Sequence, residues 1–200
     1  SPAGLDGEVM LKLRGGEWIT IRPIRPDDAK RLQNSFAQMS SQTIYDRFMG
    51  YKKVLLDQEA HDLTSLDYDC HMALVASTSG PNGEESIIGV ARYYVLDDEP
   101  SCAEFAIVIN DAYQRQGLGI HLFMRLMEYA QAHGICTFIG YAHGENYRLL
   151  RFVQRTGLPI ERKLKDGLWE IRVQLAGIDF SKAEKFSPNN MEVEHEHQHS

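Results

Sequence analysis

A short turn with two glycines is the part of this sequence best suited to bind a ligand. It runs from Gln114 to Gly119, after the apolar run Phe105–Ile109 and before a run with helical spacing at 120–133. A strand, such a turn and a helix in this order leave unpaired backbone N–H groups at the positive end of the helix, and such a nest binds phosphate. Glycine would let a ligand oxygen approach the backbone closely, and it adopts positive φ at little cost.

The spacing of this turn excludes two common phosphate-binding loops. It is too short for a Walker loop and lacks the Gly-Lys-Ser/Thr ending, and it lacks the first glycine of the dinucleotide-binding fingerprint. The remaining interpretation is a pyrophosphate-binding turn of another kind, and coenzyme A carries a pyrophosphate. The alternative is an ordinary tight connection between a strand and a helix.

Glu104 is the leading candidate for a catalytic side chain. It lies in a run of apolar and small residues, Cys102–Val108, where a carboxylate is costly unless it is paired or functional. Partial desolvation would make it a stronger base near neutral pH, suited to removing a proton from an amine. The alternative is a structural glutamate that pairs with Arg92 or Arg22.

Histidines and cysteines offer weaker candidates. No histidine among His61, His71, His121 and His143 has a carboxylate or a second histidine at motif spacing. Near the C-terminus, His195, His197 and His199 could bind Zn²⁺ or Ni²⁺, but we interpret that segment as a disordered acidic tail and predict no metal site. The cysteines, Cys70, Cys102 and Cys136, are interpreted as reduced core or strand residues of a cytosolic protein.

Composition and charge limit the class of protein. The chain has 200 residues, a formal net charge of −7 and no block of basic residues, which argues against a nucleic-acid or anionic-membrane binder. No apolar run approaches the ~20 residues that span a bilayer. We therefore expect one cytoplasmic domain at 17–177, a flexible arm at 1–16 and a polar, His-rich tail at 178–200.

The elements that would position the turn and Glu104 follow from periodicity and from turn residues. We expect a strand at 18–21, helices that start near Asp27, Ser41 and Asp57, and an antiparallel meander of strands at 71–77, 87–96 and 102–109. The helix after the turn ends at Gly134, and a parallel strand at 136–141 follows it. A helix at 146–156 and a hairpin of strands at 159–164 and 168–175 complete the domain.

This order of elements, with the pattern Gln-x-x-Gly-x-Gly after the fourth strand, resembles the Gcn5-related N-acetyltransferase (GNAT) family over residues 17 to 176. Further runs are similar to the acetyltransferase domain of bacterial Pat-type protein-lysine acetyltransferases: Ile21–Asp28, Tyr45–Phe48, Leu66–Ala76 and Ala103–Ile109. The resemblance implies an α+β fold, in which helices flank a mixed, mostly antiparallel central sheet. It also implies acetyl-CoA as co-substrate, with no metal required.

The resemblance assigns roles to individual residues. Glu104 would be the general base, strand residues would pair with the pantetheine arm, and Asn146 would lie near that arm or cap its helix. The residues implied to bind the cofactor are Ile107, Val108, Ile109, Gln114, Arg115, Gln116, Gly117, Leu118, Gly119, Ile120 and Asn146. Many members carry a tyrosine where this chain has Val153, so the proton for the departing thiolate has no evident source, and Tyr147 is a distant substitute.

Three functions follow from this reading. The first is transfer of an acetyl group to lysine ε-amines of proteins, which predicts an acidic groove beside Glu104. The second is acetylation of a small amine such as a polyamine, an amino acid or an antibiotic, and the third is a non-catalytic acyl-CoA sensor. We expect a monomer or homodimer that binds acetyl-CoA and its acceptor, with neither nucleic acid nor membrane as a partner.

Overall fold

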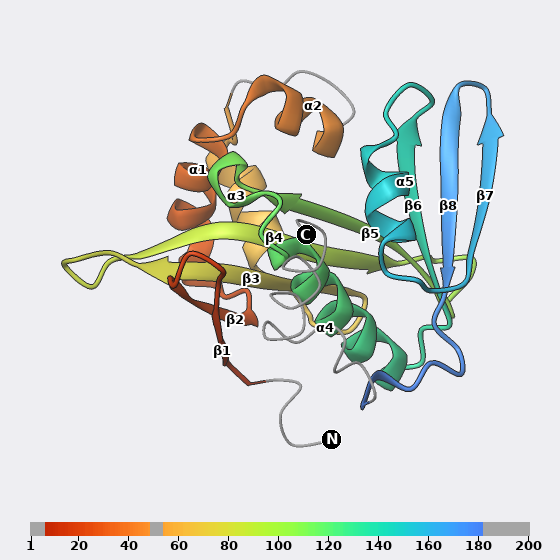
Figure 1. The fold of residues 1–200 in the computed structure, drawn as a ribbon, viewed down its shortest axis with the longest axis horizontal. Helices are drawn as coiled ribbons and strands as arrows, with labels where there is room; N and C mark the ends of the chain where they lie inside the picture. Colours follow the sequence, from red (N-terminus) through yellow and green to blue (C-terminus); the bar gives the residue numbers. More distant parts are fainter. Residues whose placement is uncertain (1–6, 49–53, 182–200) are drawn as a thin grey trace, which may run out of the picture.

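Apart from β1, the strands and helices follow the order that the sequence predicts. The computed structural model describes residues 7–48 and 54–181 (Figure 1). The strands there are β1 Val9–Lys12, β2 Trp18–Pro23, β3 His71–Ser79, β4 Glu85–Val95, β5 Cys102–Ile109, β6 Thr137–His143, β7 Ile160–Lys165 and β8 Leu168–Gln174. The α-helices are α1 Ala29–Ala37, α2 Ser41–Phe48, α3 Asp57–Thr64, α4 Leu118–Ala132 and α5 Arg148–Gln154.

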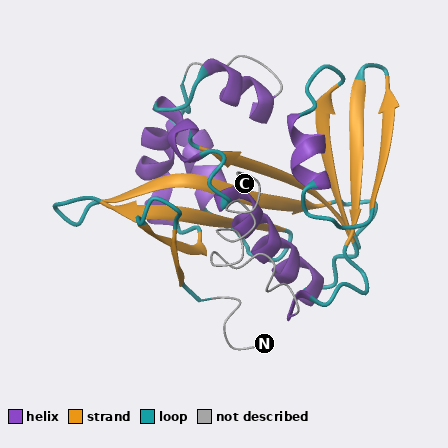
Figure 2. Ribbon diagram, viewed as in Figure 1, coloured by secondary structure: helices purple, strands orange, loops and turns teal. Residues whose placement is uncertain are grey.

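The described strands form one eight-stranded sheet in the order β1-β2-β3-β4-β5-β6-β8-β7. Every neighbouring pair in this order is antiparallel except β5 and β6, which are parallel. In Figure 2, helices α1, α2 and α3 form one group, α4 runs across the middle strands, and α5 lies beside β6. The predicted α+β fold, with helices flanking a mixed and mostly antiparallel sheet, is confirmed.

The N-terminal arm departs from the prediction. Part of the segment expected to be flexible, Val9–Lys12, forms β1, which pairs antiparallel with β2 from Val9↔Ile21 to Lys12↔Trp18. Leu11 packs against the core, while Met10 is exposed. This alternation extends over only four residues, and the strand is stabilised by its partner, β2.

Two apolar cores cover the two faces of the sheet. One lies under α4 and α5 and contains the rings of Phe105, Phe123 and Phe138. The other lies under α1, α2 and α3 and contains Phe36 and Val75. Because side chains alternate along β5, Phe105 and Ile107 face the first core, and Glu104 lies on the same face as Val108, which packs against the second.

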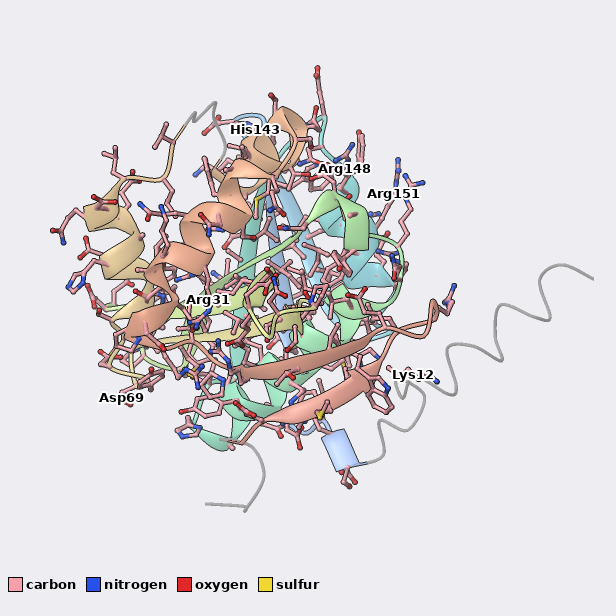
Figure 3. The ribbon with its side chains drawn as sticks, turned by 90° about the vertical axis from the view of Figure 1, so that its left-hand side faces the viewer. Lys12, Arg31, Asp69, His143, Arg148 and Arg151 are labelled. Atoms are coloured by element: carbon pink, nitrogen blue, oxygen red, sulfur yellow. The ribbon has the colours of Figure 1, made fainter. Side chains whose placement is uncertain are left out.

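A buried ionic network joins β2, the start of α1 and β4. Arg22 donates to both carboxylate oxygens of Asp28 at 2.7 and 2.8 Å and to Oε1 of Glu85 at 2.8 and 3.0 Å. Arg22 and Asp28 are 2% and 0% exposed. Arg31 of α1, which is labelled in Figure 3, adds a contact of 3.1 Å to Asp28. The network fixes α1 on the sheet, so the sequence alternative that paired Arg22 with Glu104 is wrong.

The Asp28 carboxylate makes stability depend on pH. Burial by itself would raise its pKa, but hydrogen bonds from Arg22 and from the backbone N–H of Arg25 outweigh burial and hold the pKa below its ordinary value. A carboxyl group with a lowered folded pKa stabilises the fold above its unfolded pKa of ~3.9, and this contribution is lost as the pH falls through the folded value.

We therefore predict that Asp28→Asn lowers the free energy of unfolding at pH 7 by about 3–5 kcal/mol, because it removes the buried one of the two carboxylates that compensate the guanidinium of Arg22. Urea unfolding monitored by circular dichroism measures this change. The matched control is Asp27→Asn, one residue away with a side chain 65% exposed, whose ion pairs should contribute less than about 1 kcal/mol. Equal losses in the two variants would contradict the role given to Asp28.

Candidate active site

Strands β5 and β6 pair only at their start and then diverge. Their parallel register covers Cys102↔Thr137, Ala103↔Phe138 and Glu104↔Ile139. Beyond this point β5 continues along β4 as far as Gly89↔Ile109, and β6 continues along β8 as far as His143↔Leu168. Figure 1 shows the two strands starting together and spreading apart. Among the described strands, none pairs with the edge of β5 that faces this divergence, where the predicted pantetheine contacts Ile107 and Val108 lie.

A close packing contact lies at the point of divergence. A Cβ atom on Gly140 would lie 2.5 Å from Cζ of Phe105 and 3.2 Å from Cδ2 of Leu149 in α5. Glycine at this position therefore lets the Phe105 ring approach the backbone of β6, just where pairing stops. Phe105 is fixed there by the rings of Phe123 and Phe138, with centroids at 4.8 and 5.6 Å.

The glycine turn has the geometry of a nest. Arg115 and Gly117 have φ of 63° and 82°, and α4 starts at Leu118. The hydrogen bonds of the described residues include none donated by the backbone N–H groups of 115–120, and the first helical bond there runs from His121 N to Gly117 O at 3.2 Å. These N–H groups lie at and just before the start of α4, where an anion can accept their hydrogen bonds.

The two glycines of the turn serve different purposes. Gly117 has the positive φ that the prediction required. Gly119 is needed for close packing instead, because a Cβ there would lie 3.0 Å from the ring of Phe152 in α5. Of the two reasons that the sequence argument gave for glycine at 119, positive φ does not apply, and close approach of a ligand oxygen stays a prediction; the structure adds that this glycine allows α5 to approach α4.

Hydrogen bonds from Gln114 hold the turn in place. Its Nε2 donates to the carbonyl of Ile109 at 2.9 Å and to Oγ1 of Thr43 at 3.2 Å, and its backbone N–H donates to Asp111 O at 3.3 Å. The carbonyl of Ile109 is thus engaged by the protein itself. Because the side chain of Gln114 binds the carbonyl of Ile109, we assign Gln114 a positioning role. Direct contacts of these two residues with the cofactor stay a prediction.

Helix α5 starts two residues after Asn146. The Oδ1 atom of Asn146 accepts the N–H of Arg148 at 3.1 Å, so Asn146 shapes the start of this helix, as one of its two predicted roles requires. Val153 is 0% exposed in the apolar core, with Leu149 and Phe152 packed against that core. Tyr147 is exposed and its ring lies 6.5 Å from that of Trp169. The apolar side chains of Val153, Leu149 and Phe152 cannot donate a proton.

Arginines on α5 and at its C-cap, Arg155, were missed by the sequence reasoning. Arg148, Arg151 and Arg155 are exposed, and Figure 3 shows the first two projecting from the same part of the helix. The guanidinium of Arg155 lies 5.8 Å from the ring centroid of Phe152, which in turn contacts the start of α4 at Gly119. Their spacing of three and four residues along one helix was a signal available in the sequence.

Glu104 is the last paired residue before the divergence, and it is exposed. The expected desolvation is therefore wrong: its immediate neighbours, Ala103 and Phe105, are buried on the opposite face of the sheet, while Glu104 itself is exposed. Its direct cross-strand partner is Tyr94 of β4. Arg92, the other arginine considered for it, donates to the carbonyl of Leu63 at 3.1 Å and lies 3.2 Å from Nε2 of His71. Arg47 of α2 interacts with Glu104 by charge.

Carboxylates gather on the side of Glu104 that faces β6 and β8. Burial, and then the charges of Glu170 and Glu104, raise the pKa of Tyr141, with Glu99 adding to the effect. Arg172 pairs with Glu170 at 3.1 Å and reaches Glu99 at 4.0 Å. Arg172 thus offsets part of the negative charge on this side, and the acidic groove that the protein-lysine hypothesis expects stays a prediction.

The histidines and cysteines do not form a site. Burial and the charge of Arg92 lower the pKa of His71 to about 4, so this histidine is neutral near pH 7 and its Nε2 accepts from Arg92. The described residues contain no group of three potential metal ligands, and 195–199 lie outside them. Cys102 is buried, but Cys70 and Cys136 are exposed, which corrects their expected burial. Of the helices described, none is long and apolar enough to cross a membrane.

A sheet opened between two parallel strands, with an anion-binding nest at the start of the next helix, is the architecture of the acyl-CoA N-acyltransferases. The sequence model described as the acetyltransferase (GNAT) family matches residues 41–158. The chain therefore belongs to this family, as the resemblance predicted.

Relatives and solved structures agree with this assignment. Acetyltransferase Pat of Mycolicibacterium smegmatis is 30% identical over 152 residues, which are 74% of this chain and 44% of that protein, so this chain spans less than half of it. Acetyltransferase PA5475 of Pseudomonas aeruginosa is 34% identical over 137 residues, 66% of this chain and 70% of that one.

The GNAT domain of Streptomyces lividans PAT superimposes with a TM-score of 0.75 at 25% identity, covering 87% of this chain and 99% of that one. The structure of yncA from Salmonella typhimurium with its cofactor acetyl-CoA shares the fold, with a TM-score of 0.61 at 17% identity over 80% and 95% of the two chains.

We predict that Gly117→Ala weakens acetyl-CoA binding at least tenfold, because a Cβ at positive φ costs about 1–2 kcal/mol and displaces the nest. Isothermal titration calorimetry measures the affinity. The matched control is Gly134→Ala at the other end of α4, where φ is 87° and no atom lies within 4 Å of the added Cβ. It should lose similar stability yet bind normally, and equal loss of binding in both variants would argue against the nest.

Proposed function

We propose that this chain transfers an acetyl group from acetyl-CoA to the ε-amine of lysine residues in proteins. The observation that carries the proposal is the divergence of β5 and β6, which leaves one edge of β5 open from Glu104 to the nest. The pantetheine arm carries amides that suit an open strand edge, and the pyrophosphate suits the N–H groups of 115–120.

The donor would be held mainly by the backbone. With pantetheine along β5 and the pyrophosphate at the nest, the thioester would lie near the point where the strands separate. A main-chain N–H of β5 would then polarise the thioester carbonyl and stabilise the tetrahedral oxyanion. Glu104 stands at this same point, on the face of the sheet away from α4.

Glu104 would act as the base. A lysine ammonium has a pKa of ~10.4 and must lose a proton before its nitrogen can attack. An exposed carboxylate can take that proton directly or through water, and the exposure of Glu104 favours an acceptor that arrives from solvent.

A protein lysine suits the surroundings of Glu104 better than a small enclosed amine. The carboxylates of Glu170 and Glu99 lie near Tyr141, beside Glu104, and would attract a cationic side chain. Strand β7, the edge strand of the sheet beyond β8, is exposed at every residue after Ile160. A surface of this kind leaves room for the rest of a polypeptide.

We predict that Glu104→Gln lowers kcat by ~10²–10⁴-fold, with acetyl-CoA affinity unchanged, because the amide cannot accept the proton. Steady-state release of coenzyme A thiol measures kcat, and calorimetry measures the affinity. The matched control is Glu161→Gln, on the exposed strand β7, which should keep full activity. Unchanged turnover of the Glu104 variant at every pH would remove the base assignment.

We also predict that Arg155→Ala weakens acetyl-CoA binding about tenfold and reduces its salt dependence, because a cation beside the nest is lost. Titrations at low and high salt measure both effects. Arg162→Ala is the matched control, since that guanidinium also covers an aromatic ring, Trp169, at 6.0 Å, but on the distant hairpin. If both variants bind alike, Arg155 has no part in the donor site.

The acceptor is tested by offering purified protein and labelled acetyl-CoA to a cell lysate and, in parallel, to polyamines, amino acids and aminoglycosides. Mass spectrometry should find acetyl-lysine on proteins and little product among the small amines. Modification of a small amine alone would support the second function, and binding of acetyl-CoA without transfer to any acceptor would support the sensor.

A further inference from the structure

The turn that would hold the pyrophosphate contains a residue in an unfavourable conformation. Arg115 has a φ of 63°, in the left-handed region that residues other than glycine rarely adopt. Gln114, just before it, is extended, with φ of −68° and ψ of 153°, so the backbone changes conformation sharply between these two residues. A left-handed conformation at such a residue persists only where neighbouring contacts fix it. The nest therefore depends on the contacts that hold Gln114 in place.

Hydrogen bonds join the segment before the nest, residues 110–114, to α1, to α2 and to the connection between these helices. They are Ser35 Oγ to Asn110 Oδ1 at 2.9 Å, the N–H of Ser40 to Asp111 Oδ1 at 3.1 Å, and Gln114 Nε2 to Thr43 Oγ1 at 3.2 Å. The last of these acts directly on Gln114. Thr43 is buried in α2, which packs on the face of the sheet opposite α4.

The side-chain amide of Gln114 has two hydrogens, and each of them has a partner. Nε2 donates to the carbonyl of Ile109 at 2.9 Å as well as to Oγ1 of Thr43. A carbonyl oxygen only accepts, so the NH2 group of the amide, and not its oxygen, must face Ile109. The two bonds together fix the plane of the amide, whereas the bond to Ile109 alone would let the amide turn about it.

The hydroxyl of Thr43 is itself held in place, and α2 does not need this hydroxyl in order to start. Ser40 Oγ accepts the backbone N–H of Thr43 at 3.1 Å, which is the usual N-cap bond of a helix. The Ser40 hydroxyl also donates to Oγ1 of Thr43 at 3.1 Å. A hydroxyl oxygen accepts two hydrogen bonds, so Ser40 and Gln114 use both lone pairs of Thr43. Because the cap bond uses the backbone of Thr43, loss of the hydroxyl removes the contact with Gln114 and leaves α2 capped.

We propose that the hydroxyl of Thr43 is a positioning group for acetyl-CoA. It orients Gln114, and Gln114 holds Arg115 in the conformation that directs the N–H groups of 115–120 toward the pyrophosphate. This inference rests on the donor site of the proposed function. It gives a residue on the acceptor face of the sheet control over the affinity for the donor, while Glu104 and its surroundings stay as they are.

The first test compares Thr43→Val with Thr43→Ser. Valine has nearly the shape of threonine but no hydroxyl, so we expect acetyl-CoA to bind ~fivefold more weakly, as the loss of one hydrogen bond predicts. The KM for acetyl-CoA should rise by the same factor, while kcat and the KM for a lysine peptide stay within about twofold. Thr43→Ser keeps the hydroxyl and should bind like the wild-type protein. Calorimetry measures the affinity, and release of coenzyme A thiol measures kcat and both KM values.

The matched control is Thr64→Val in α3. Thr64 is also buried in a helix on this face of the sheet, but its hydroxyl donates to the carbonyl of Ala60 in its own helix at 2.8 Å. This variant should bind acetyl-CoA like the wild-type protein, whatever its effect on stability. Thermal unfolding of all three variants without ligand checks that the fold is intact.

A second test is a double-mutant cycle with Gln114→Leu, which removes the amide hydrogens. Because Thr43 would act through Gln114, Thr43→Val should cause no further loss of acetyl-CoA affinity in the Gln114→Leu variant. Additive losses would show that Thr43 acts by another route, and they would overturn the inference.

The outcomes separate this inference from the proposed function. Unchanged acetyl-CoA affinity in Thr43→Val overturns the role of Thr43 alone. A higher KM for the lysine peptide with unchanged acetyl-CoA affinity also overturns it, because that pattern marks a residue that only supports α2. A wild-type protein that binds acetyl-CoA but acetylates no amine removes the proposed function, and a fivefold loss of affinity in Thr43→Val would still support the positioning role. A wild-type protein that does not bind acetyl-CoA removes both proposals.

Discussion

The candidate site depends on where strand pairing ends: β5 pairs with β6 only as far as Glu104. A sheet normally pairs every central strand along both edges, and an unpaired edge leaves backbone donors and acceptors unused. Here the pairing of β5 with β6 ends next to the place where the ring of Phe105 packs against Gly140 of β6. The open edge of β5, the place of the nest at its end and the position of Glu104 at its start all follow from this single divergence.

The two substrates would be recognised by different means. The proposed donor side consists of backbone groups of consecutive residues, from β5 through the nest into α4, with the guanidinium of Arg155 at the C-cap of α5 beside it. The proposed acceptor side consists of side chains from separate strands, chiefly β5, β6 and β8. Glu104 belongs to both, because it ends the paired part of β5 and points to the face away from α4.

This difference explains how much the sequence could predict. The bounds of β5 agree with the prediction, and the nest follows, because period-two alternation and a glycine turn are local signals. Strand β1 was missed because its four residues need β2 as a partner, and Glu104 was wrongly expected to be desolvated because neighbours in a strand face opposite sides. The network of Arg22, Asp28 and Glu85 joins residues 63 positions apart, and no spacing rule indicates it.

The charges around Glu104 are mixed on the side of β6 and β8, and this bears on the acceptor that Glu104 could serve. There Glu170 and Glu99 are paired with Arg172 at 3.1 and 4.0 Å. On the side of β3 and β4, Arg92 donates to the carbonyl of Leu63 and to Nε2 of His71. Glu104 itself is exposed at the point where β5 and β6 separate, so an ammonium that arrives from solvent would reach its carboxylate directly. A base in such a position does not need a closed acceptor pocket, which is the reason for proposing a lysine on the surface of another protein.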